Sequence, residues 1–396
     1  MLKINTMLAV LGMALATTSY GQTAVSNEDR SLTTALIADA QTRTGCDSNG
    51  VTGHDSSGFF LSGNDGFRMN IGGDFQFRYT YNNSDDADAE YGFNIPLTRL
   101  RFNGTIHNSL DFMIEPGFND DSGDVDLYNA FIGWQAMDNG RLQFGQFQLP
   151  FLREDSTPDR FQLAADKSIM SYIFGQGYSQ GVQFAYDAGD FRMIGAFSDG
   201  FNSANTDYTD PAEADYSLTA RAEYLVAGSR SDFSDFTAQQ NQQNSLLLGG
   251  AVNYQDSDLQ SNVFSYTGDV SWENSGWNAY LAGVGRNMDD LGESFNDYGV
   301  ELQGGYRVTE QIEPFVRYDA IFADSARNLA NDDMNFLTAG VNYYLYGHAA
   351  KFTADAVWSL DDTSGLSSLG DFSHTGVLGS PEDNEITLRL QFQVLF

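Results

Sequence analysis

The residues of this chain best suited to chemistry are arginines that stand at alternate positions within apolar segments. Arg99 and Arg101 flank Leu100, and Arg78 follows Phe77 in a run of alternating apolar and polar residues. A guanidinium group presents five N–H donors in a rigid fork, which suits phosphate and carboxylate oxygens. The pattern therefore predicts a surface that can hold anions, provided that these side chains share one wet face.

Most of the 20 Lys and Arg residues fall in such segments. Those that we expect to line a water-filled lumen are Arg78, Arg99, Arg101, Arg141, Arg221, Arg307, Arg317 and Lys351. A second interpretation is that they pair with acids on the same faces and brace the wall; these acids are Asp74, Glu115, Glu223, Glu301, Asp319 and Asp355. The expected loops are acidic, as in residues 84–90, and could enrich cations instead. Ion selectivity therefore stays open at this point.

Other kinds of chemistry find little support. The histidines His54, His107, His348 and His374 fall in a linker, in two turns and in a loop, so none can serve a serine nucleophile. No spacing typical of a metal site or a phosphate-cradling glycine loop is present. With 54 acidic against 20 basic residues the formal net charge is −34, which disfavours nucleic acid as a partner. We expect no enzyme activity, no metal and no cofactor.

The elements that must position the arginines are strands, as the last thirteen residues show most clearly. Side chains of successive residues in a strand point to opposite faces. One face would carry Ile386, Leu388, Leu390, Phe392, Val394 and Phe396, and the other would carry Thr387, Arg389, Gln391 and Gln393. A strand that faces lipid on one side and water on the other alternates in this way. We interpret the final residue, Phe396, as the C-terminal assembly signal of a transmembrane β-barrel.

Composition agrees with an all-β membrane protein. The mean hydropathy is −0.34, yet aromatic residues make up 14% of the chain. After the first residues no apolar run approaches the roughly 20 residues that a membrane helix needs. Forty Gly and 7 Pro suit many strands joined by turns, and the single cysteine, Cys46, excludes an internal disulfide framework.

Alternation and turn signals predict about 16 antiparallel strands. The expected ranges are 67–82, 93–107, 110–119, 125–137, 141–149, 180–187, 190–198, 214–227, 245–255, 262–273, 276–287, 296–308, 311–323, 335–346, 349–361 and 384–396. Tight turns alternate with longer acidic segments, as in outer-membrane barrels, where the short turns face the periplasm. The connection 228–244 is too long for such a turn and could hide a strand pair, so 14 or 18 strands remain alternatives.

A barrel of this size is wide enough for an aqueous channel. The long segment 150–179 contains the basic residues Arg153, Arg160 and Lys167. We expect it to fold inward as a constriction loop. The alternative is that it caps the outer mouth or contacts a neighbouring subunit.

Three regions follow along the chain. Residues 1–21, with Lys3 before a short apolar run and small residues near Gly21, are predicted to be a secretory signal peptide. Residues 22–66 would form a short periplasmic helix, beginning near Ser26, and a linker with one short strand around Phe59. Residues 67–396 would form the barrel.

Several segments resemble those of the phosphate-selective porins O and P. They are Gly72-Gly73-Asp74-Phe75-Gln76-Phe77-Arg78-Tyr79, Arg99-Leu100-Arg101-Phe102-Asn103-Gly104-Thr105, Gly145-Gln146-Phe147-Gln148-Leu149-Pro150-Phe151, Glu313-Pro314-Phe315-Val316-Arg317-Tyr318-Asp319 and Gly340-Val341-Asn342-Tyr343-Tyr344-Leu345. The resemblance spans roughly residues 59–396. It implies a sixteen-stranded, trimeric outer-membrane porin whose inward loop and lumen arginines guide anions.

The sequence thus predicts an outer-membrane porin of a Gram-negative-type bacterium. It would pass small hydrophilic solutes and ions passively, with anions or phosphate as candidate preferred solutes, and its partners would be membrane lipid and two further copies of itself. The alternative is a structural or adhesive barrel with a plugged lumen. Ion conductance in a planar bilayer distinguishes the two.

Overall fold

The computed structural model describes residues 51–55, 58–64, 66–85, 87–118, 123–210, 213–240, 242–257, 261–290, 292–381 and 383–396. The predicted signal peptide (1–21), the predicted helix near Ser26 and Cys46 lie outside the described residues. The architecture below concerns the unit that begins at Thr52.

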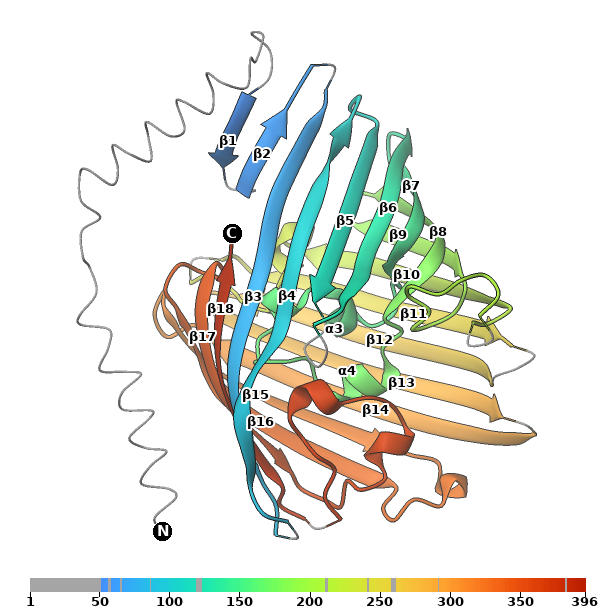
Figure 1. The fold of residues 1–396 in the computed structure, drawn as a ribbon, viewed down its shortest axis with the longest axis vertical. Coiled ribbons are helices and arrows are strands. Elements are labelled where there is room, and N and C mark those ends of the chain that lie inside the picture. The colour runs from blue at the N-terminus through green and yellow to red at the C-terminus, as the bar shows by residue number, and fades with distance from the viewer. Residues whose placement is uncertain are drawn as a thin grey trace. The chain divides into compact units, whose positions relative to one another are not determined.

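Sixteen consecutive strands of the described chain, β3 to β18, pair antiparallel with their sequence neighbours, and β18 pairs with β3 to close a barrel (Figure 1). Their bounds are β3 Arg68–Asn83, β4 Glu90–Ile106, β5 Leu110–Phe118, β6 Val125–Met137, β7 Gly140–Gln148, β8 Tyr178–Ala188, β9 Phe191–Ser198, β10 Tyr216–Ala227, β11 Ser245–Asp256, β12 Asn262–Asn274, β13 Trp277–Asp290, β14 Glu293–Tyr306, β15 Ile312–Phe322, β16 Asp333–Tyr344, β17 Ala350–Ser359 and β18 Ile386–Leu395. The predicted number is confirmed. In its described residues the connection 228–244 contains no strand, so the alternatives of 14 and 18 barrel strands are wrong.

Two short strands precede the barrel strands and extend the same sheet. β1 (Val51–Asp55) pairs with β2 (Gly58–Ser62), and β2 pairs with the first residues of β3, from Phe59 opposite Ile71 onward. β18 pairs with the remainder of β3 from Asp74. Within the predicted linker, the short strand expected around Phe59 is therefore part of β2.

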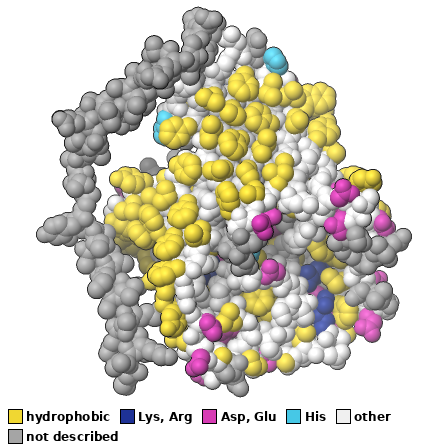
Figure 2. All heavy atoms as spheres, in the orientation of Figure 1, with side chains coloured by type: hydrophobic (Ala, Val, Ile, Leu, Met, Phe, Trp, Pro, Cys, Tyr) yellow, Lys and Arg dark blue, Asp and Glu magenta, His cyan; other side chains and the backbone are white. Residues whose placement is uncertain are grey.

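The barrel wall is apolar outside and polar inside, the reverse of a water-soluble sheet. In β12 the side chains of Phe264 and Tyr266 are 44% and 45% exposed, whereas the intervening Ser265, Thr267 and Asp269 are buried. Figure 2 shows hydrophobic side chains gathered over the strands on one side of the molecule. This inversion is what lipid outside and polar groups inside require. In the described residues, no helix is both long and apolar enough to span a bilayer.

The lumen is largely filled by three connecting segments. The inward loop (149–177) carries the helices α3 (Arg153–Ser156), η2 (Asp159–Phe161) and α4 (Ile169–Phe174). The strap (228–244) carries η3 (Arg230–Phe233), and the terminal loop (360–385) carries η5 (Leu366–Ser368) and η6 (Ser373–Thr375). A further short helix, η4 (Ser325–Arg327), lies in the loop between β15 and β16.

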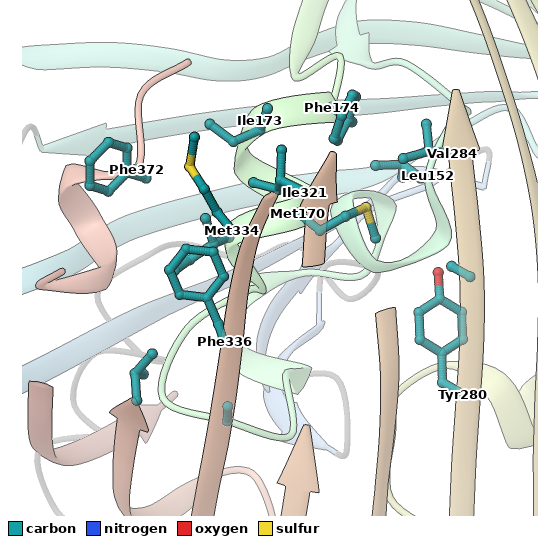
Figure 3. Close-up of a cluster of buried hydrophobic side chains, with 14 of the residues drawn as sticks. Leu152, Met170, Ile173, Phe174, Tyr280, Val284, Ile321, Met334, Phe336 and Phe372 are labelled. Atoms are coloured by element: carbon teal, nitrogen blue, oxygen red, sulfur yellow. The ribbon is translucent and has the colours of Figure 1, made fainter. Parts of the chain in front are cut away.

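A buried hydrophobic cluster joins these segments to the wall. Met170 and Phe174 of α4, Met334 and Phe336 of β16 and Phe372 of the terminal loop all belong to this cluster (Figure 3). Apolar side chains of β11, β13, β15, β16 and β17 belong to this cluster, together with residues of the three segments. The filled half of the lumen therefore lies along those strands.

Candidate functional site: the lumen constriction

Wall carboxylates fix the inward loop to β15 and β17. The backbone N–H of Ile169, at the start of α4, donates to Asp319 at 3.0 Å, and the N–H of Ala165 donates to Asp355 at 2.9 Å. Ser168 caps α4 by accepting from the N–H of Ser171 at 3.0 Å. Carboxylates that accept N–H groups at a helix start satisfy donors that would otherwise be buried without partners. The loop is therefore anchored to the wall through backbone N–H groups, with the Ser168 side chain capping α4.

Basic side chains of the wall hold the same loop through its carbonyl groups. Arg317 donates to the carbonyl of Asp166 at 2.9 Å, Arg78 to that of Ala165 at 2.8 Å, and Lys351 to that of Gln162 at 2.9 Å. Arg221 likewise donates to the carbonyl of Phe151 at 3.0 Å and pairs with Asp269 at 2.8 Å.

We expected Arg221, Arg317 and Lys351 to line the pore, but the structure buries all three beneath the inward loop, where each is at most 4% exposed. The reason is that this half of the lumen is filled with protein. These side chains meet carbonyl and carboxylate oxygens in place of solutes, in keeping with the bracing interpretation.

Other predicted basic residues of the wall and the loop are also paired with acidic or carbonyl groups. Arg101 and Arg160 both contact Asp74, at 2.8 and 3.0 Å, so a wall residue and a loop residue share one carboxylate. Arg141 pairs with Asp111. Arg307 donates to the carbonyl of Glu310 at 2.8 Å and, through a second nitrogen, to Gln239 of the strap at 3.1 Å.

The strap is a feature that the sequence analysis missed. Phe236 packs against the ring of Tyr280 with centroids 5.2 Å apart, and Thr237 bonds to Tyr344 at 3.0 Å. Arg153 of the inward loop, expected as a constriction residue, donates to the carbonyl of Phe233 at 2.6 Å and lies over the Phe233 and Phe236 rings. The inward loop and the strap thus contact each other inside the barrel. Two phenylalanines in an otherwise polar connection were the available signal.

The terminal loop is the second missed element. Glu385 is 1% exposed and accepts the backbone N–H groups of Leu378, Gly379 and Ser380 at 2.6 to 3.2 Å. Arg78 donates to the carbonyl of His374 at 2.7 Å. Apolar residues spaced through this acidic loop, Leu366, Leu369, Phe372 and Val377, could have revealed its burial.

A cavity lies between the inward loop and the first barrel strands, and we call it the eyelet. It is a cavity of about 200 Å³ between β3, β4 and β6 on one side and the inward loop on the other. Its charged lining residues are Arg78, Arg99, Lys167, Asp155, Asp159 and Asp166, and its aromatic lining residues are Tyr128, Tyr172, Tyr178 and His374. Of the predicted basic residues, Arg78, Arg99 and Lys167 are therefore the ones that line this cavity together.

Ion pairs cross the eyelet from wall to loop and within the loop. Arg99 contacts Asp159 at 2.9 Å, Arg78 contacts Asp166 at 2.9 Å, and Lys167 contacts Asp155 at 3.0 Å. Burial alone would raise the pKa of Asp159, but Lys167 and Arg99 hold it well below its usual range. Burial alone would lower the pKa of Lys167, but Asp155 and Asp159 hold it well above. Opposite charges that approach this closely favour each other's ionised form.

The charged groups of the eyelet differ in how many of their hydrogen-bonding atoms have partners. Asp155 accepts from Lys167, from the side chain of Gln148 at 3.1 Å and from the N–H of Gly177 at 3.2 Å. Asp166 accepts from the hydroxyl of Tyr172 at 2.5 Å in addition to its arginine. By contrast, within the described chain no acceptor lies within hydrogen-bond range of Nε of Arg99. Asp155 and Asp166 are thus each held by several donors, whereas the buried Nε of Arg99 is left without a partner.

The C-terminal residue closes the barrel at β3. The N–H of Phe396 donates to the carbonyl of Gly73 at 3.1 Å, and the N–H of Gly73 donates back at 2.9 Å. A side chain at position 73 would collide with the ring of Phe396, because its Cβ would lie 2.4 Å from a ring carbon. The role of Phe396 as an assembly signal stays a prediction. Among the residues that the structure describes, no group of three His, Cys, Asp or Glu residues could hold a metal ion.

Comparison with known proteins adds a family and a set of similar folds. The family model described as Phosphate-selective porin O and P matches residues 67–393. No curated protein matches the sequence. Similar solved structures include the anion-selective porin from Comamonas acidovorans, with 13% identity over 83% of this chain and 99% of that chain and a TM-score of 0.60. The outer membrane channel DcaP of Acinetobacter baumannii has 15% identity over 84% and 99%, with a TM-score of 0.57. OmpT of Vibrio cholerae in its trimer form has 15% identity over 84% and 100%, with a TM-score of 0.55.

Proposed function

The chain belongs to the phosphate-selective porin O and P family and forms an outer-membrane channel for passive diffusion of small hydrophilic solutes, and from this premise we propose that the eyelet is its selectivity filter, with a mild preference for anions. The observation that carries the proposal is Arg99. Its guanidinium lines the eyelet and is held there by Asp159 and by the ring of Tyr128, 3.8 Å away. A positioned guanidinium donor favours a passing anion over a cation.

The remaining parts of the proposal concern assembly. We expect export by the signal peptide of residues 1–21 and insertion as a homotrimer. The trimeric form of the similar OmpT supports the second expectation. Chemical crosslinking of the protein in native membranes tests it, since a ladder that stops at three subunits is expected and a pure monomer would contradict it.

Removing the arginine of the eyelet should weaken the anion preference. In an Arg99→Ala variant, Asp159 loses one of its cations and the filter gains about one net negative charge. A unit charge at 4 Å is worth about 1 kcal/mol even in water, so the chloride-to-potassium permeability ratio should fall about fivefold. Reversal potentials in asymmetric KCl measure this ratio. Arg192→Ala is the matched control, because Arg192 lies on β9, 3.4 Å from Asp187, and does not line the eyelet. Equal reversal potentials for the two variants would contradict the proposal.

The ion pairs of the eyelet should make its selectivity insensitive to pH across the neutral range. The pKa of Asp159 is held well below its usual range, so its carboxylate stays ionised until the pH falls through that low value. The pKa of Lys167 is held well above its usual range, so its ammonium stays charged until the pH rises through that high value. Between about pH 5 and 9 both stay charged.

The matching measurement is the reversal potential across that pH range in a His374→Gln variant, which removes the imidazole that lines the eyelet. We expect a flat profile. A midpoint inside the range would show that one of the eyelet carboxylates or Lys167 titrates there, against the geometry described above.

A further inference from the structure

The barrel wall contains a seam between β6 and β7 at the level of the eyelet. The two strands pair from Met137 opposite Gly140 as far as Ala130 opposite Gln146. Beyond this point Val125, Asp126, Leu127 and Asn129 of β6 pair with β5 alone, with Tyr128 at a bulge, and the last residues of β7 pair with β8 alone. The backbone of this end of β6 therefore needs partners other than a neighbouring strand.

Side chains supply these partners at Leu127. Its N–H donates to Oδ1 of Asn205 at 3.1 Å, and Nδ2 of Asn205 donates to the Leu127 carbonyl at 3.2 Å. Gln146 completes the arrangement, because its amide donates to the carbonyls of Leu127 and Tyr128 and accepts the N–H of Asn205 at 2.8 Å. One asparagine thus makes the pair of bonds that a strand residue would make.

The loop that carries Asn205 is itself fixed to the other side of the seam. The N–H of Asn202 donates to the carbonyl of Gln176 at 2.9 Å, and the hydroxyls of Ser203 and Ser179 lie 2.8 Å apart. The side chain of Gln180 donates to the carbonyl of Thr206 at 2.8 Å. Residues 202–206 therefore fill the seam as a piece of wall, held by β6 on one side and by the start of β8 on the other.

The seam matters because the residue after Leu127 belongs to the eyelet. Tyr128 lies beneath the guanidinium of Arg99 and edge-on to Tyr178, with ring centroids 5.4 Å apart. We propose that Asn205 is a positioning residue of the channel: by clamping Leu127 it fixes Tyr128, and through Tyr128 the place of the Arg99 guanidinium in the eyelet. The inference rests on the proposed function of the eyelet as selectivity filter, while its structural part can be tested apart from conduction.

The sharpest variant is Asn205→Gly. Asn205 has a left-handed backbone with φ of 60°, which glycine adopts without strain, so the substitution removes the side chain and little else. Asn328→Gly is the matched control. Asn328 is also left-handed, with φ of 53°, lies in an external loop, and donates within that loop to the carbonyl of Ala326.

The first measurement is hydrogen exchange of the purified full chain in detergent micelles, with peptides that cover residues 125–129. Loss of one backbone partner should speed exchange at Leu127 about fivefold in Asn205→Gly, with no change in Asn328→Gly. Asn205→Asp keeps the acceptor for this N–H and should restore slow exchange. An unchanged exchange rate in Asn205→Gly would show that Asn205 does not hold the backbone of Leu127, whether or not the protein conducts.

The second measurement is the reversal potential and single-channel current noise of the same variants in planar bilayers. Asn205→Gly should shift the reversal potential in the direction of Arg99→Ala and increase the noise, while Asn328→Gly matches the wild type. Faster exchange with an unchanged reversal potential would overturn the positioning role. If the wild type itself showed no conductance, the proposed function would fail, and the exchange result alone would decide the clamp.

Discussion

An Arg78→Ala variant is expected to lose a large part of its stability and to conduct more current than the wild type. Arg78 is 1% exposed and connects three parts of the molecule. It donates to Gln391 of β18 at 2.8 Å, to the carbonyl of His374 in the terminal loop, and to Ala165 and Asp166 of the inward loop. Removing one partner of a buried ion pair typically costs about 3 to 5 kcal/mol. Because both loops lose an anchor, the eyelet should widen.

Thermal unfolding, followed by the shift in gel mobility of the heat-denatured barrel, measures the first effect, and single-channel conductance measures the second. The unfolding temperature and the conductance of Arg78→Lys should lie between those of the wild type and Arg78→Ala. An ammonium group can pair with Asp166, but it lacks the planar fork that lets the guanidinium reach four acceptors. Arg192→Ala, which breaks a half-exposed pair, should cost at most about 1 kcal/mol. A wild-type unfolding temperature in Arg78→Ala would refute the anchoring role.

A Phe236→Ala variant is expected to open a second path through the filled half of the barrel. Phe236 is 4% exposed and packs against Tyr280 of β13 and the guanidinium of Arg153. Truncating a buried phenylalanine typically costs about 3 to 5 kcal/mol, because the cavity left behind collapses only in part. The strap would lose its apolar contact with Tyr280 of the wall. Arg153 would lose one of the two aromatic rings that its guanidinium contacts.

The expected readouts are a lower unfolding temperature and a conductance increase that persists in an Arg99→Ala background, since the new path would bypass the eyelet. Tyr346→Ala serves as control, because Tyr346 is an aromatic residue on a periplasmic turn and is 80% exposed. If the conductance of Phe236→Ala remained equal to that of the wild type, the strap would not block a second path.

The strands and their number could be derived from the sequence alone because each strand obeys a local rule. Lipid on one side and polar groups on the other impose a period of two on every segment, as in β18, and this rule needs no knowledge of distant residues. Strand ends such as those of β6 and β12 followed from turn residues in the same local way. The parity of polar and apolar positions also placed Arg78 and Arg99 on the inner face.

The tertiary structure alone decided which inner-face charges meet solutes. Arg317 and Arg99 occupy similar positions in the sequence pattern, yet one lies beneath the inward loop and the other at the eyelet. The difference arises from contacts between residues more than a hundred positions apart, such as Arg317 with Glu154, and from where the strap and terminal loop dock. The docking of these loops depends on their shape and on the pairing of individual groups. Neither produces a periodic pattern in the sequence. The sequence by itself therefore determined a lipid-facing barrel with a basic inner wall, and the folded loops determined where that barrel stays open.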